Sequence, residues 1–287
     1  MILVTGARGV VGTPLLEKLN NSGSTVLAVS RSPTGVSGLQ WDMQSPLDAD
    51  AHAALSGLHS VVHCAPLWLL PPHLTQLHQS GMRRLVAFSS TSVVSKQQSS
   101  NKVEQDLVQR LSEAEAALNE FSETHNLATT LFRPSMVYGY GRDQNVMHLA
   151  RFIKRFKFAL VAGGGQGLRQ PVHADDLVAA VIFALDNPRT HGKTYNLAGG
   201  ESLSYRAMLE KIFTGLGQKP RILSLPVGLF RALLKVAAKL GTFDYTPAMA
   251  SRMQQDLVYE FDAAREDFGY MPRAFLQQPE QDLRGCR

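Results

Sequence analysis

Three glycines mark a place in this sequence that could bind a phosphate group. The apolar run 2–4 leads directly into Gly6, Gly9 and Gly12, and a largely apolar segment, 10–19, follows. The pattern predicts a strand, a tight turn and a helix, in which Gly6 permits the turn, Gly9 lets the backbone approach an anion and Gly12 lets strand and helix pack closely. The helix start presents free N–H groups to a pyrophosphate. We expect contacts from Gly6, Gly9, Val10, Val11 and Gly12.

An arginine after the next expected strand indicates which dinucleotide fits. That strand covers 25–29 and ends at Ser30-Arg31-Ser32. An acidic residue at this place would accept hydrogen bonds from the ribose 2′-OH of NAD, whereas an arginine can pair with the 2′-phosphate of NADP. Arg8, inside the glycine turn, could approach the same phosphate. We therefore expect NADP(H) rather than NAD(H); the alternative for Arg31 is a solvated loop side chain.

The segments that must position these residues alternate between strand and helix. Further strands are expected at 39–42, 59–64, 84–89 and 127–133, and helices at 48–55, 72–80 and 102–125. This alternation predicts an α/β fold with a doubly wound parallel sheet, a Rossmann fold, with right-handed crossovers. Ligands lie at the carboxyl ends of such strands. The expected cofactor contacts beyond the glycine turn are Arg31, Asp42, Ala65, Pro66, Ser89, Ser90, Pro134 and Val137.

The pattern changes after residue 143. Short strands are expected near 169–173 and 194–198, and helices over 146–156, from about 175, over 204–216 and over 226–240. We expect residues 1–143 to form the dinucleotide-binding domain. Residues 144–287 are expected to form mainly a smaller C-terminal α/β substrate domain, with 173–198 returning to the first sheet.

Composition excludes several classes of function. The chain has 287 residues, a net charge of +5 and 44% hydrophobic residues, and no apolar run approaches the roughly 20 residues of a membrane span. Two distant cysteines and the absence of a signal-peptide pattern favour the cytoplasm. The basic stretch 151–157 has apolar residues at helical spacing, so we interpret it as a core-facing helix with a solvated basic face. We expect the protein to bind a small-molecule substrate and not a nucleic acid, a membrane or a metal ion. The protein could be a monomer or a homodimer.

Seven segments, in order along the chain, resemble a known family. They cover 5–12, 62–65, 87–91, 132–139, 169–176, 195–200 and 262–272. The chain resembles the extended and atypical short-chain dehydrogenases/reductases, the NAD-dependent epimerase/dehydratase group. The resemblance implies a Rossmann domain and a small C-terminal domain that covers a substrate cleft.

The resemblance also implies where catalysis would take place. The family uses a Tyr as acid/base, a Lys four residues later, and a Ser or Thr after the fifth strand; Tyr and Lys must share a helix face. Matching Ala114-Glu115 to the family pattern puts Leu107 and Leu111 at the Tyr and Lys positions, and leucine cannot transfer a proton. The remaining candidates for catalysis are Thr91 and Tyr138. Lys96 and Lys102, which flank the serine-rich loop, are interpreted as solvated lysines.

The substrate side follows from the same resemblance. In sugar-nucleotide relatives the arginine that matches Arg169 contacts the substrate diphosphate; the alternative is an ion pair with Asp175 or Asp176. Asn145 opens a helix that lines the substrate site. Three functions stay open: an NADP(H)-dependent oxidoreductase or epimerase-like enzyme acting on a small polar or anionic substrate, a non-catalytic NADP-binding redox sensor or assembly protein, and a nucleotide-sugar epimerase.

Overall fold

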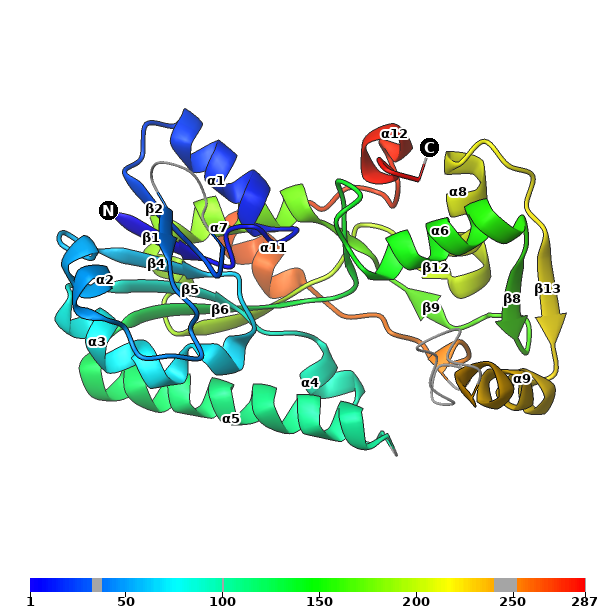
Figure 1. Cartoon of the computed structure of the whole chain (residues 1–287), viewed down its shortest axis with the longest axis horizontal. Helices are drawn as coiled ribbons and strands as arrows, with labels where there is room; N and C mark the ends of the chain where they lie inside the picture. Colours follow the sequence, from blue (N-terminus) through cyan, green and yellow to red (C-terminus); the bar gives the residue numbers. More distant parts are fainter. Residues whose placement is uncertain (33–37, 100, 240–251, 287) are drawn as a thin grey trace.

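A parallel seven-stranded sheet forms the larger of two lobes in the computed structural model, which describes residues 1–32, 38–99, 101–239 and 252–286 (Figure 1). Its strand order is β11-β6-β5-β4-β1-β2-β3. The bounds are β1 Ile2–Thr5, β2 Val26–Ser30, β3 Gly38–Gln40, β4 Ser60–His63, β5 Arg84–Phe88, β6 Ala128–Pro134 and β11 Lys193–Leu197. Every neighbouring pair in this sheet is parallel. The predicted α/β class and doubly wound parallel sheet are confirmed.

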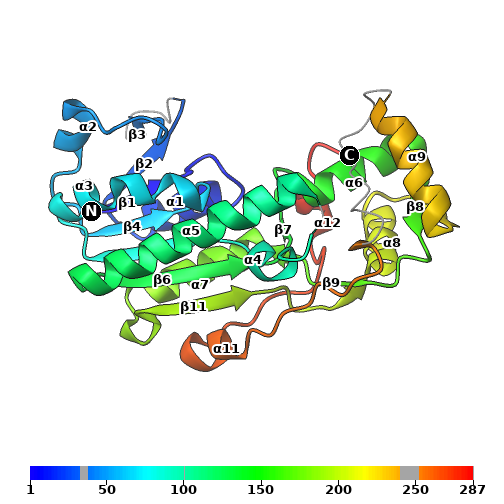
Figure 2. The same cartoon turned by 90° about the horizontal axis from the view of Figure 1, so that it is seen from below.

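Helices cover both faces of this sheet (Figures 1 and 2). On one face lie α1 Gly12–Asn21, α7 Ala174–Leu185 and α11 Asp262–Phe268; on the other lie α2 Ala49–Ala54, α3 Leu74–Gln79 and the long α5 Lys102–His125. Successive side chains of a strand point to opposite faces. Leu3 accordingly packs in the core beneath α5 while Val4 packs in the core beneath α1. Short apolar runs form the central strands because both faces are buried.

The smaller lobe has its own core. It contains α6 Asn145–Phe156, α8 Tyr205–Gly215, α9 Val227–Lys239 and α12 Pro279–Asp282. Its parallel strands are β8 Ala159–Ala162 with β13 Ile222–Leu225, and β7 Val137–Tyr138 with β10 Val172–His173; β9 Leu168–Arg169 and β12 Leu203–Ser204 are antiparallel. Ile153, Ile212, Phe213 and Phe230 pack together between these elements. The chain re-enters the large lobe at α7 and β11, and again at α11 (Figure 1).

Some expected elements differ in extent. The strand expected at 39–42 ends at Gln40, which leaves Asp42 in a turn. The strand expected at 169–173 is two short strands, β9 and β10, on either side of Pro171. The last residue of the helix expected over 226–240 lies outside the described residues. Within the described ranges, none of the helices combines the length and apolar character needed to cross a membrane.

Candidate functional site

The glycine turn is packed so closely that side chains would not fit. Gly6 has a φ of +65°, and a Cβ on it would lie 2.6 Å from the backbone N of Ala65. A Cβ on Gly12 would lie 2.3 Å from the carbonyl O of Gly6. Within the described chain, no hydrogen-bond acceptor faces the backbone N–H groups of Val10, Val11 or Gly12. Free donors at the start of α1, in a turn that has no room for a side chain at Gly6 or Gly12, fit a pyrophosphate.

The end of β2 lies beside this turn. The N–H of Ala7 donates to the carbonyl of Val29 at 3.2 Å, so Arg8 and Arg31 come to the same edge of the sheet. Both side chains are exposed, and neither guanidinium has a hydrogen-bond or ion-pair partner among the residues that the structure describes. Asp42 is exposed at the next strand end, where its Oδ1 accepts from the N–H of Gln44 at 3.1 Å. Its carboxylate caps a turn.

A buried histidine supports the end of β4. His63 Nδ1 accepts from the Thr5 hydroxyl at 2.8 Å, and Nε2 donates to the carbonyl of Pro66 at 3.1 Å. Burial lowers the pKa of His63 to about 4, so the ring is neutral near pH 7. The ring thereby holds Pro66, which is exposed, and Ala65, which is half-buried, beside the glycine turn.

The hydroxyls at the end of β5 are engaged within the fold. Ser89 donates to Glu115 of α5, which also binds the Arg133 guanidinium through two hydrogen bonds. Thr91 donates to the carbonyl of Pro134 at 3.2 Å. Ser90 donates to the Ser92 hydroxyl at 3.1 Å. Ser90 and Thr91 nonetheless border a large pocket.

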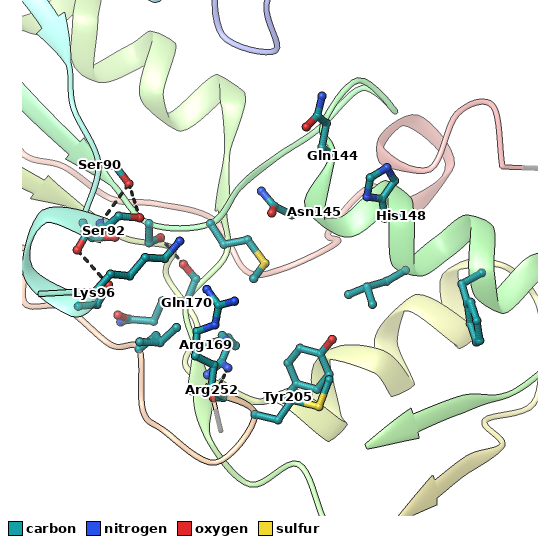
Figure 3. A pocket seen from close by; sticks show the side chains of 18 of the residues that line it. Ser90, Ser92, Lys96, Gln144, Asn145, His148, Arg169, Gln170, Tyr205 and Arg252 are labelled. Atoms are coloured by element: carbon teal, nitrogen blue, oxygen red, sulfur yellow. Dashed lines mark hydrogen bonds between the residues drawn. The ribbon is translucent and has the colours of Figure 1, made fainter. Parts of the chain in front are cut away.

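That pocket, of about 860 Å³, separates α4 Ser92–Ser95 from the smaller lobe (Figure 3). Its polar walls come from α4, from α6, from β9 with Gln170, and from the segment 252–259. No Asp or Glu belongs to the lining as far as the described residues go. Five cations do: Lys96, Arg151, Arg155, Arg169 and Arg252. This wall favours an anionic ligand.

Arg169 lines the pocket and also holds neighbouring backbone segments together through hydrogen bonds. It is 4% exposed and donates to the carbonyls of Leu168 at 2.6 Å, Gln255 at 2.8 Å and Arg252 at 2.6 Å. The ion pair with Asp175 or Asp176, weighed as an alternative, does not form, because Arg273 binds both carboxylates. Asn145, the first residue of α6, also lines the pocket.

Tyr138 is not brought to Thr91. It lies on β7, not in a loop, and is fully buried in the core of the smaller lobe. Its hydroxyl accepts from the N–H of Leu276 at 3.1 Å and donates to the carbonyl of Ala274 at 3.4 Å. Burial raises the pKa of Tyr138. Tyr138 is not among the pocket residues, so the structure gives its hydroxyl no route to a ligand there.

The two leucines at the expected Tyr and Lys positions serve packing. Leu111 is buried in the core between α5 and the sheet, and Leu107 packs against that core. Neither lines the pocket. Pro134 is buried, and Val137 is half-buried against the core beneath α7.

Several pocket residues were not expected from the sequence. Lys96 was interpreted as solvated, but its side chain is only 23% exposed and borders the pocket; Lys102 is exposed as expected. Arg151 and Arg155, one turn apart on α6, are exposed, as expected for a solvated basic face, and they also border the pocket between the lobes. Arg252 is 83 residues from Arg169 along the chain, and no local pattern joins them. Clusters of His, Cys, Asp or Glu able to hold a metal are absent from the described part of the chain.

Comparison with known proteins decides the family. The sequence model of the NAD dependent epimerase/dehydratase family matches residues 2–68 and 73–198. The chain belongs to this family. It is similar to UDP-glucose 4-epimerase of Vibrio cholerae, with 23% identity over 96% of this chain and 92% of that protein. It is also similar to 2-alkyl-3-oxoalkanoate reductase of Stenotrophomonas maltophilia (strain K279a), with 25% identity over 96% of each.

The fold has close counterparts among solved structures. The structure of MoeE5 in complex with UDP-glucose and NAD superposes with a TM-score of 0.73 at 20% identity, covering 98% of this chain and 97% of that one. At this identity the likeness concerns the fold. Membership of this NAD dependent family indicates a nicotinamide dinucleotide as the class of cofactor. The free backbone amides of the glycine turn, and the lack of side chains at Gly6 and Gly12, suit such a dinucleotide.

Proposed function

We propose that this protein is an NADP(H)-dependent oxidoreductase or epimerase-like enzyme that acts on a small anionic substrate. The observation that carries the proposal is the pocket beyond Ser90 and Thr91, whose described lining includes five cations and no carboxylate. When bound, the nicotinamide would supply hydride transfer. The exposed Arg8 and Arg31 support NADP(H), because an arginine can pair with the 2′-phosphate.

The remaining lining suggests the character of the substrate. The lining also has apolar side chains, which are Met136, Leu149, Phe152, Phe156, Met253 and Leu257. An anion with an apolar chain would satisfy both kinds of wall. By its name, the similar reductase of Stenotrophomonas acts on a 2-alkyl-3-oxoalkanoate, a carboxylate of this character. We therefore take a 3-hydroxy or 3-oxo acid as the first substrate class to test.

The test follows NADPH formation from NADP⁺ with 3-hydroxyoctanoate. Heptan-2-ol, the same alcohol without the carboxylate, is the matched control. Loss of one charge-assisted contact costs about 1.5–3 kcal/mol, so kcat/KM for heptan-2-ol should be lower by about 10- to 150-fold. Equal rates for the two alcohols would contradict the anionic substrate. Absence of NADPH binding in calorimetry would contradict the whole proposal.

Two other functions predict different experimental results. Arg169 and Arg252 side by side in the pocket favour a nucleotide-sugar epimerase as the second candidate. It predicts tight binding of UDP that weakens in Arg169→Ala; unchanged UDP affinity would count against it. A non-catalytic NADP-binding redox sensor or assembly protein, suggested by Leu107 and Leu111, predicts NADPH binding without hydride transfer to or from any tested compound.

A further inference from the structure

The proposed reaction needs a group that moves a proton at the substrate oxygen. We propose that Lys96 is that acid/base residue, taking the place of the missing Tyr and Lys pair. In alcohol oxidation the neutral Lys96 amine would accept the proton of the substrate hydroxyl, and NADP⁺, when bound, would supply the acceptor for the hydride from the carbon that bears this hydroxyl. The products would be a carbonyl compound, NADPH and the Lys96 ammonium. The ammonium then releases its proton to water. This inference rests on the proposed function.

The position of Lys96 follows from the connection between β5 and α5. Thr91, at the end of the β5 segment, precedes the single turn of α4, and Lys96 terminates that turn. Its side chain is largely buried, and Figure 3 shows it extending from α4 into the pocket, on the same side as Ser90 and Ser92 and toward Gln170. Lys96 is therefore an ionisable pocket side chain in the same segment as Ser90 and Thr91, which follow β5.

The other pocket groups suit this task less well. The four arginines stay protonated at any relevant pH. His148 is exposed on α6, and Figure 3 shows it across the pocket from Ser90. Tyr205 begins α8, in the smaller lobe, with the Arg169 guanidinium 5.4 Å from its ring centre, and Tyr259 lies on the segment 252–259, so neither belongs to the segment that follows β5. The Thr91 hydroxyl donates to the Pro134 carbonyl.

Charges around Lys96 leave its amine available. Its Nζ lies 3.5 Å from Glu104 Oε1, but Glu104 also accepts from Ser99 at 2.7 Å and binds Arg252 more closely. An ammonium has three N–H donors, so one contact to Glu104 leaves others for the pocket. Burial and the nearby Arg252 lower the pKa of Lys96, and Glu104 opposes them. Burial has the larger effect, which brings the neutral amine closer to working pH.

A titration that needs no substrate tests this assignment. Trace acetylation with acetic anhydride across a pH series, read by peptide mass spectrometry, gives the midpoint at which each lysine becomes reactive. Lys96 should reach its midpoint at a lower pH than Lys102, which is exposed at the start of α5. Glu104→Gln should lower the Lys96 midpoint further, because it removes the opposing charge. A Lys96 midpoint equal to or above that of Lys102 would overturn the inference.

Turnover of 3-hydroxyoctanoate provides the second test. General acid–base catalysis contributes about 10²–10⁴-fold, so Lys96→Met should lower kcat by that factor while NADP⁺ affinity stays unchanged. Lys102→Met is the matched control and should keep wild-type kcat. Wild-type kcat should rise with pH through the Lys96 midpoint, and Lys96→Met should lack this rise. If Lys96→Met keeps the wild-type kcat and pH profile, the role of Lys96 is overturned but the proposed function is not. If the wild-type protein shows no turnover, the result counts against the proposed function, and the acetylation midpoints then test Lys96.

Discussion

Replacing Arg31 with alanine should change which dinucleotide the protein prefers. Arg31 is exposed after β2, without an ion-pair partner among the described residues, so its guanidinium need not leave another contact to bind a phosphate. A hydrogen bond to a charged group is worth about 1.5–3 kcal/mol, and solvent exposure favours the low end of that range. About 1.5 kcal/mol corresponds to roughly a tenfold weaker Kd for NADP⁺. The Kd for NAD⁺, which lacks the 2′-phosphate, should change little.

Isothermal titration calorimetry with both dinucleotides measures this difference directly. Arg189→Ala is the matched control, because it removes another exposed arginine, which precedes β11 at the opposite edge of the sheet. The advantage of NADP⁺ in the wild type should also shrink as salt is raised, since the Debye length falls from about 10 Å at 0.1 M to about 3 Å at 1 M. Equal weakening of NADP⁺ and NAD⁺ in Arg31→Ala would refute the assignment of Arg31 to the 2′-phosphate.

Two further substitutions test the frame of the cofactor site. Gly12→Ala should abolish NADP⁺ binding and lower the midpoint of thermal unfolding, because the new Cβ would lie 2.3 Å from the Gly6 carbonyl oxygen. Gly228→Ala is the control and should change neither property, because its Cβ would meet nothing within 4 Å. Intact NADP⁺ binding by Gly12→Ala would contradict the packing argument. Because the folded pKa of His63 is about 4 against 6.5 unfolded, the neutral ring stabilises the fold above pH 6.5, and about 3 kcal/mol is lost as pH falls from 6.5 to 4. Urea unfolding across this range should show the loss in the wild type and not in His63→Gln; equal slopes would refute the buried neutral ring.

The fold was predictable from sequence because its signals are local. Each central strand is a short apolar run, and each run ends at a small or polar residue where the chain turns. Gly6 is an example: its positive φ and its contact with the end of β4 both require a residue without a side chain. In β11, Tyr195 and Leu197 are buried and alternate with the polar Thr194 and Asn196, which is the local pattern of a strand with one apolar side.

The pocket beside α4 was not predictable, because residues distant in the sequence form its wall. Lys96 and Lys102 have the same side chain six residues apart, and only the short turn of α4 directs Lys96 into the pocket and leaves Lys102 outside. The alternating apolar and basic residues of α6 are equally compatible with a basic face toward solvent or toward a second lobe. Arg169 could be placed near the substrate, but its acceptors are backbone carbonyls that carry no sequence signal.

The packing of α5 depends on a polar contact and on two leucines. Glu115 of this helix is buried and binds both Ser89, just after β5, and Arg133 on β6, so α5 is attached to the ends of these two neighbouring strands. Removing one partner of such a buried pair costs about 3–5 kcal/mol, so this attachment restricts change at Glu115. One and two turns before Glu115, Leu111 and Leu107 add apolar packing on the sheet-facing side. In the reaction proposed above, proton transfer comes from another segment at the same strand end, and α4, which joins β5 to α5, places the ionisable side chain of Lys96 there.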